Sequence, residues 1–504
     1  MAQRIDTPYF FYALHATLFL AVAYMTVTNM AGLYIASDLG GSAETSVYPM
    51  VFFGLGHLFS IPITAPLSDR FGSVKLLVYA LLLYTFFSHL CGTAPTFFVL
   101  NLYRVGLGFA AGFFYVLCRQ LMLAFAPEEK LGTYVFINIL LFAVVPVVGV
   151  SFGAWLAYET HWRWIFFFNE PIALGLAAYF WLKFRHLDPE PMPCVFDGVG
   201  YFFFCLSTAS LLTAATLSQE LDWYRSWVLV GLVAMGLPSL IFFLWWSFLH
   251  PTPLFEFRLL KNPLLFFSLS SLAILFSSYF GMIILISLWL NIYVNYTPLW
   301  VAVLIGTMGI AALAAFVLSK SFLHQLDPRI TLALGILTLA VSCYYSTYFD
   351  MEVDFFHLAV ARSLSGVGLM LFLFPIFRLS FASYGPEKGT SIYVLFQMVR
   401  VLFSSLGAGM YVILWQRRQV FFHERLGENL TETSQLTAQY FDRATRIFHL
   451  TKEQATEQLS IYQTQQATSL ALNDVFGFMG YLLMALLIVL LLSLRYTKVS
   501  RPLP

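Results

Sequence analysis

The chain has 504 residues, of which 60% are hydrophobic and only 11% are charged, whereas soluble domains carry about 25% charged residues. This composition excludes water as the main solvent and indicates a protein with many membrane-spanning segments. The formal net charge of +1 provides no basic field for nucleic acid, and the five cysteines contain no C-x-x-C pair that would indicate a metal site or a disulfide framework.

Fourteen apolar runs are long enough to cross a bilayer as helix, which requires about 20 residues. We predict spans near residues 10–36, 46–66, 76–94, 97–124, 132–157, 164–182, 198–217, 226–249, 264–293, 299–321, 330–349, 356–382, 390–415 and 471–494. No small-residue cleavage site follows the first run, so we expect it to be a retained span. The predicted fold class is an all-α integral membrane protein.

The basic residues predict the orientation of these spans. Of the 27 Lys and Arg residues, sixteen fall on the face that holds both termini and eight on the opposite face, while Arg104, Arg362 and Arg400 lie within spans. Because short cytoplasmic loops are enriched in Lys and Arg, both termini are predicted to be cytoplasmic. Six of the eight opposite residues belong to the long loop 416–470.

The loop 416–470 is rich in Gln and Thr, with Leu, Ile and Phe at intervals, which predicts one or two amphipathic helices. Two interpretations stay open. The loop could be a docking surface for an external partner such as a periplasmic adaptor, or it could be a solvated connector.

Between the second and third spans, the segment APLSDRFGSVK at residues 65–75 follows the pattern G-x-L-x-D-R-x-G except for Ala65. It resembles the inner-loop motif of the major facilitator superfamily, which implies a gating role for Asp69, Arg70 and Gly72. An aspartate there can accept hydrogen bonds at the positive end of a helix, and a glycine permits a tight turn.

Two further segments extend the resemblance. Arg104 to Gly108 is similar to the R-x-x-x-G pattern of the superfamily's fourth helix, and HWRWIFFFNEPI at residues 161–172 resembles the sixth helix of the EmrB/QacA branch. That branch consists of fourteen-span drug:proton antiporters. The resemblance implies the major facilitator fold, with six-helix halves at residues 1–183 and 263–504, two inserted helices within 184–262, and a midplane cavity that opens alternately to each side.

The fifth and first spans depart from the antiporter pattern. Pro146, Gly149 and Gly153 match the helix-5 motif P-x-x-G-P-x-x-G-G, but Val150 replaces its second proline. In the first span, Tyr24 occupies the position where the antiporters carry an embedded acid. Proton-coupled antiport is therefore not secured by the resemblance.

Three residues are candidates for proton or ion coupling. The resemblance implies proton transfer for Arg104, although a structural arginine bonded to carbonyl groups is an equal alternative. Glu170 lies inside the sixth span and His57 at the centre of the second, where burial favours a functional titration. The alternatives are a Glu170 hydrogen-bonded near the outer interface, to Asn169 or Arg163, and a His57 that only packs.

The candidate substrate cavity combines aromatic and polar residues within the spans. Tyr24, Tyr103 and Tyr115 could stack on a flat or cationic ligand. The remaining candidates are Asn29, Arg362 and Arg400.

We expect a secondary active transporter of a bacterial inner membrane that exports small amphipathic organic compounds, energised by a proton or another ion. The chain lacks a G-x-x-x-x-G-K-[ST] nucleotide loop, and we expect neither a cofactor nor a metal. Two alternatives stay open: a narrow-substrate carrier for a siderophore or metabolite with different coupling or direction, and a non-transporting sensor or scaffold. No nucleophile–base constellation indicates an enzyme.

Overall fold

The fold is described from a computed structural model. It describes residues 7–42, 44–188, 196–221, 223–322, 327–382, 384, 388–428, 430–431 and 434–496, and these residues form helices and no strand. Cys194 and the terminal residues 1–6 and 497–504 lie outside the described ranges.

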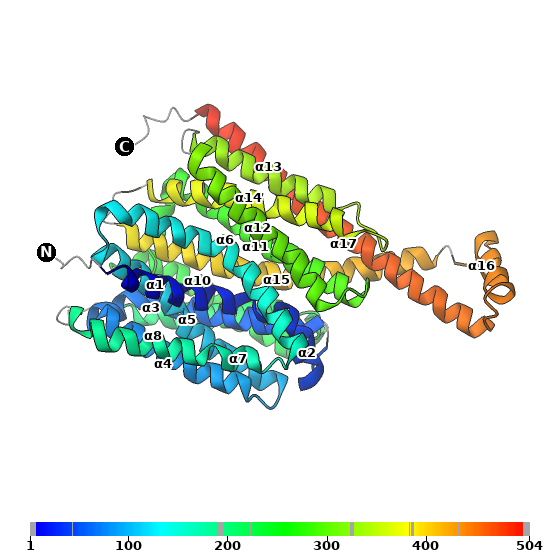
Figure 1. The fold of residues 1–504 in the computed structure, drawn as a ribbon, viewed down its shortest axis with the longest axis horizontal. Coiled ribbons are helices and arrows are strands. Elements are labelled where there is room, and N and C mark those ends of the chain that lie inside the picture. The colour runs from blue at the N-terminus through cyan, green and yellow to red at the C-terminus, as the bar shows by residue number, and fades with distance from the viewer. Residues whose placement is uncertain are drawn as a thin grey trace.

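The helices of the N-terminal part run roughly along one common direction in Figure 1. They are α1 (Pro8–Thr26), α2 (Thr28–Leu39), α3 (Tyr48–Phe71), α4 (Ser73–Gly92), α5 (Phe97–Phe125), α6 (Glu128–Glu159), α7 (Trp164–Phe168) and α8 (Glu170–Phe184), followed by α9 (Gly198–Leu217) and α10 (Trp227–Leu249). The short 3-10 helices in this part are η1 (Glu44–Val47), η2 (Arg185–Leu187) and η3 (Trp223–Arg225).

The C-terminal part begins after the 3-10 helix η4 (Phe257–Lys261). Its helices are α11 (Pro263–Ile292), α12 (Pro298–Phe322), α13 (Pro328–Ser346), α14 (Phe355–Ala382), α15 (Gly389–Gly427), α16 (Gln435–Arg446) and α17 (Lys452–Tyr496).

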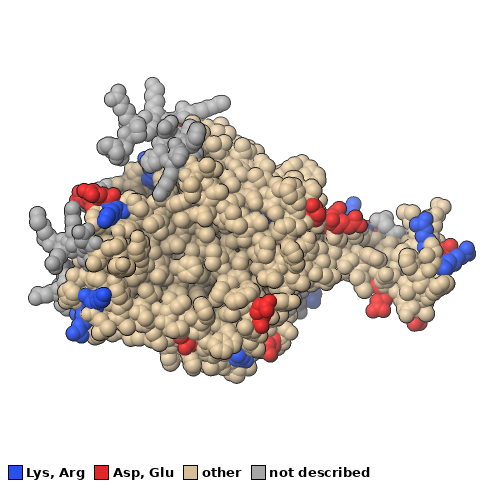
Figure 2. Space-filling model, in the orientation of Figure 1, with Lys and Arg blue, Asp and Glu red and all other residues tan. Residues whose placement is uncertain are grey.

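Fourteen helical segments of the described chain are long and apolar enough to cross a membrane, which confirms the predicted number of spans. The first span bends at Val27, between α1 and α2, and the sixth is divided at Asn169 into α7 and α8. On the face shown in Figure 2, charged side chains gather at the two ends, and the belt between them is almost free of charge. Such a belt matches a hydrocarbon core.

Two helix bundles lie side by side (Figure 1). In the first, α3 and α4 pack on α5, α8 packs on α4, and α1 packs on α6; in the second, α14 packs on α12 and α13, and α15 packs on α11 and α17. The bundles meet mainly where α6 contacts α12 and where α3 contacts α15. We call the end of the molecule where α1 begins and α17 ends the terminal end, and the opposite end, which carries α16, the hairpin end.

The helix pair α9 and α10 is held in place by one buried carboxylate. Asp197 accepts hydrogen bonds from the backbone N–H of Gly200 (2.8 Å) and Leu254 (3.3 Å) and from Nε1 of Trp246 (3.0 Å). Helix α9 contacts both α3 and α15, and so bridges the two bundles. Tyr201 fixes this position, because its hydroxyl donates to the carbonyl of Phe59 on α3 (3.0 Å).

Helices α15 and α17 continue well beyond the predicted spans 390–415 and 471–494. Their 39 and 45 residues correspond to about 58 and 68 Å of helix, against a hydrocarbon core of about 30 Å. They project past the hairpin end and carry the amphipathic α16 (Figure 1). The predicted spans contain only the apolar part of each helix. Both helices continue beyond it into polar sequence. Most of the predicted loop is therefore helix.

Candidate functional site

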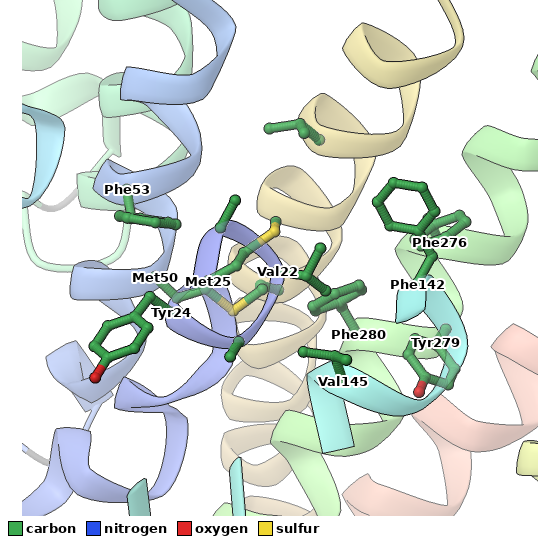
Figure 3. Close-up of a cluster of buried hydrophobic side chains, with 14 of the residues drawn as sticks. Val22, Tyr24, Met25, Met50, Phe53, Phe142, Val145, Phe276, Tyr279 and Phe280 are labelled. Carbon is green, nitrogen blue, oxygen red and sulfur yellow. The ribbon is translucent and has the colours of Figure 1, made fainter. Parts of the chain in front are cut away.

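The centre of the interface between the bundles is filled by apolar side chains from both of them. Figure 3 shows Val22 and Met25 of α1, Met50 and Phe53 of α3 and Phe142 and Val145 of α6 together with Phe276, Tyr279 and Phe280 of α11. The hydroxyl of Tyr279 donates to the carbonyl of Ala143 across the interface (3.4 Å). This centre is buried and largely apolar.

The bundles also contact each other toward both ends. Near the hairpin end, Oγ of Ser151 on α6 donates to the carbonyl of Ala302 on α12 (2.9 Å). Near the terminal end, the rings of Phe136 on α6 and Phe316 on α12 stack with centroids 4.0 Å apart. The described arrangement is therefore closed at both ends of the α6–α12 contact.

The helix-5 residues bring α6 against the first span. A Cβ on Gly149 would lie 2.5 Å from the Ala23 carbonyl oxygen, and a Cβ on Gly153 would lie 1.9 Å from that of Val27. The hydroxyl of Thr26 also donates to the carbonyl of Pro146 (2.7 Å), which adds a hydrogen bond between the two helices. The motif thus seats α6 at the bend between α1 and α2.

Arg104 is fully buried and bonded to backbone. Its Nε donates to the carbonyl of Pro49 (2.9 Å) and its Nη2 to the carbonyl of Tyr24 (2.9 Å), while Phe53 lies under the guanidinium at 4.3 Å. These contacts tie α5 to α1 and α3. They match the structural alternative for this residue.

Tyr24 does not point its hydroxyl into the interface. The hydroxyl donates to the carbonyl of Ile165 on α7 (2.8 Å), and the ring packs edge-on against Tyr84 with centroids 6.0 Å apart. Asn29, one turn further along, is buried, and neither atom of its amide has a hydrogen-bond partner in the described structure.

His57, Tyr115 and Arg400 form one buried group between the bundles. The His57 ring lies 5.1 Å from the Tyr115 ring, and the Arg400 guanidinium lies over Tyr115 at 4.7 Å and over Phe142 at 4.6 Å. Both ring nitrogens of His57 and Nη2 of Arg400 lack hydrogen-bond partners in the described structure. Of the candidate residues, the structure brings these three together between the bundles, and it brings Arg104 and Tyr24 together within the first bundle.

Three other candidates lie away from this group. Arg362 lies inside the second bundle, where its Nη2 bonds the Ser346 hydroxyl and its guanidinium faces Phe476. Tyr103 is only partly buried on α5 and packs at the edge of the core. Glu170 lies at the start of α8, with Oε1 3.3 Å from Nδ1 of the exposed His89. This pair occupies the outer side of the first bundle near the hairpin end, and the partner of Glu170 is neither Asn169 nor Arg163.

The inner-loop motif shows an unexpected partner. Asp69 and Arg70 are exposed at the end of α3, and Gly72 has φ +89°. The carboxylate of Asp188 accepts the backbone N–H groups of Val74 (2.7 Å) and Lys75 (2.9 Å), so it caps α4 directly after Gly72. Asp188 follows α8 by only a few residues, and nothing in its local sequence indicates this long-range contact.

Arg119 of α5 is a second residue that the sequence did not single out. Its guanidinium lies over the rings of Phe381 (4.3 Å) and Tyr393 (4.4 Å), which belong to α14 and α15. It therefore closes the interface near the terminal end. A short narrow cavity beside it is also lined by Phe142, which stacks on Arg400.

The segment HWRW has a structural role at the hairpin end. Nε1 of Trp162 donates to Asp38 (3.0 Å), and Nη1 of Arg163 donates to the carbonyls of Gly92 (3.0 Å) and Ala94 (3.1 Å). These bonds join α2, the end of α4 and the start of α7.

Comparisons with known proteins agree with this architecture. The model of the Major Facilitator Superfamily matches residues 14–408. The chain is 26% identical to a protein named multidrug export protein EmrB of Haemophilus influenzae, over 94% of this chain and 93% of that one. It is 27% identical to a protein named fatty acid resistance protein FarB of Neisseria gonorrhoeae, over 84% and 83%.

Among solved structures, a bacterial homolog of the human lysosomal transporter Spinster, in an inward-facing and unoccupied conformation, superposes with a TM-score of 0.65 at 14% identity. The alignment covers 99% of this chain and 100% of that one, and it supports the fold alone. The chain belongs to the major facilitator superfamily, within its EmrB-like members, and is a multi-pass membrane transporter, not an enzyme.

Proposed function

We propose that this major facilitator protein exports small amphipathic organic compounds across a bacterial inner membrane, and that a proton gradient drives export by alternating access. The observation that carries the proposal is the interface between the bundles, where the apolar and aromatic cluster of Figure 3 lies next to the buried polar groups His57 and Arg400. Likeness over nearly the whole chain to a protein named for multidrug export supports the same direction of transport.

Alternating access requires that the two bundles rock about the central site. The division into halves at 1–183 and 263–504, with inserted helices within 184–262, is part of this proposal. Helix α9 contacts both bundles. It therefore links α3 to α15 while the two bundles move.

His57 is the residue best placed to exchange a proton. It lies in the interface with both ring nitrogens free of hydrogen bonds, and the charged groups around it are the guanidiniums of Arg104 on α5 and Arg400 on α15. Arg104 is engaged with carbonyls, and Glu170 lies outside the interface. We therefore assign the coupling role to His57, whose imidazole can accept a proton on one ring nitrogen and release it again.

The orientation and the outer projection complete the proposal. From the distribution of Lys and Arg we propose that the terminal end faces the cytoplasm, in which case the outer parts of α15 and α17, with α16, extend into the periplasm. Leu436, Ile447 and Phe448 are exposed apolar residues at the tip. We propose that a periplasmic adaptor packs against them, and exchange of Leu436 and Phe448 for Ser should abolish co-purification of such an adaptor without changing transport in vesicles.

Transport should be measured in everted membrane vesicles with an imposed inside-acid pH gradient and a fluorescent amphipathic dye. We expect dye accumulation that a protonophore abolishes, and we expect His57→Gln to remove its dependence on the gradient. Glu170→Gln is the matched control, because it also removes a titratable group from a span. Absence of flux would support a sensor or scaffold, and accumulation only under the opposite gradient would indicate an importer.

A further inference from the structure

We propose that Arg400, with Tyr115 and His57, forms a headgroup site for an amphipathic carboxylate, so that monoanions with an apolar tail are the preferred substrate class. This inference rests on the proposed export function and goes further by naming the charge and shape of the substrate. It follows from the contacts that Arg400 makes and from those that it lacks.

Arg400 is a buried cation without a counter-ion. Its side chain is 1% exposed, and its Nε donates to Oε1 of Gln397 (2.7 Å), whereas Nη2 has no partner. In the part of the chain that the structure describes, no carboxylate forms an ion pair with it. A buried charge is normally paired, so the missing partner is best supplied by a ligand.

The groups around the guanidinium come from both bundles. Tyr115 on α5 and Phe142 on α6 belong to the first bundle, whereas Arg400 on α15 and Phe276 on α11, at 5.8 Å, belong to the second. His57 on α3 adds a ring nitrogen that can donate to an anion. The site is therefore complete only when the bundles meet, as a substrate site in an alternating-access transporter must be.

Two other buried arginines also have nitrogens without a hydrogen-bond partner in the described structure, namely Nη1 of Arg104 and Nε and Nη1 of Arg362. They differ from Arg400 in position, because Arg104 donates to two carbonyls within the first bundle and Arg362 bonds Ser346 within the second. Arg119 resembles Arg400, since its Nε lacks a partner and it lies on aromatic rings at the interface. It lines a narrow cavity together with Phe142, the ring that also contacts Arg400.

The surroundings select a carboxylate with an apolar tail. A guanidinium presents a planar pair of donors that matches a carboxylate, and one fixed positive charge neutralises one negative charge. Phe142 and Phe276 contact the guanidinium, and Figure 3 shows them in one apolar cluster with Val22, Val145 and Phe280, which offers apolar surface to an alkyl or aromatic tail. A cationic amphiphile of the same length would meet an unscreened positive charge there.

The test is equilibrium binding to the purified full-length protein in lipid nanodiscs, with octanoate, octanol and octyltrimethylammonium as probes and with empty nanodiscs subtracted. Wild type should bind octanoate at least about tenfold more tightly than either of the other two, because a charge-assisted hydrogen bond contributes a factor of this size. Arg400→Gln should lose this preference and bind octanoate about tenfold more weakly, with octanol unchanged. Arg400→Lys, which keeps the charge but loses the planar pair of donors, should fall between them.

Arg362→Gln is the matched control, because it removes an equally buried arginine that lies inside one bundle. It should keep the preference for octanoate. The inference is overturned if wild type binds octanoate no better than octanol, or if Arg400→Gln retains the preference while remaining monodisperse and helical. The comparison of octanoate with octanol binding in the wild-type protein tests the inference even if a variant fails to fold. The binding test uses no gradient and is independent of the transport assay. If wild type showed no preference for octanoate but still transported dye in vesicles, the carboxylate site would be excluded and the export function would stand.

Discussion

Gly153 offers a quantitative test of how α6 is seated against the first span. In Gly153→Ala the new Cβ would lie 1.9 Å from the carbonyl oxygen of Val27, where real contacts do not fall below about 3.0 Å, so the two helices must separate by about 1.1 Å. Overpacking of this kind costs about 1–3 kcal/mol, and the higher helix propensity of alanine offsets about 0.5–1 kcal/mol of it. We expect a net loss of about 1–2 kcal/mol.

The assay is thermal unfolding of the purified protein, followed by tryptophan fluorescence and by the monodisperse fraction after heating. Gly132→Ala provides the control on the same helix, since nothing lies within 4 Å of the added Cβ. That variant should be as stable as wild type or slightly more stable. Equal melting of Gly153→Ala and Gly132→Ala would refute the proposed close contact between α6 and the bend at Val27.

Three further predictions concern single carboxylates. Asp188→Ala should destabilise the protein by about 1–2 kcal/mol, because it uncaps α4 at two backbone N–H groups; wild-type stability of this variant in the same thermal assay would contradict the capping role. Asp197→Ala removes the acceptor of three hydrogen bonds that hold α9 and α10, so protease cleavage between residues 250 and 256, the segment that contains the released Leu254, should become faster, whereas unchanged cleavage would show that packing alone holds the pair. Glu170→Gln should leave gradient-driven dye flux unchanged, since the carboxylate contacts His89 outside the interface, and loss of coupling in this variant would move the proton site from His57 to Glu170.

The sequence predicted the number of spans because each apolar run is long enough to cross a bilayer by itself. The extensions of α15 and α17 were not predictable in this way, because their outer turns are polar and owe their helicity to contacts between the two helices. One such contact is the bond from Trp415 Nε1 to the carbonyl of Thr468 (3.0 Å). A contact between residues so far apart in the chain cannot be predicted from the local amino-acid composition.

The candidate site was predictable only as a set of unusual residues. An arginine, a histidine or a glutamate within a span is visible in the sequence, but its neighbours are not. Tyr24 and Glu170 look equally embedded in the sequence, yet one bonds a backbone carbonyl and the other contacts an exposed histidine. Asp188 and Arg119 act through residues far away in the chain, so no local pattern indicated either of them.

The unpaired charge of Arg400 also bears on the energy of transport. A bacterial membrane holds the cytoplasm electrically negative, and an anion that moves outward gains about 2.3 kcal/mol for each 100 mV that it crosses. An anion held by Arg400 leaves the cytoplasm in the direction that this voltage favours, so the voltage adds to the proton gradient that acts through His57. Neither part of the driving force then depends on a carboxylate in the first span, and a tyrosine can occupy position 24.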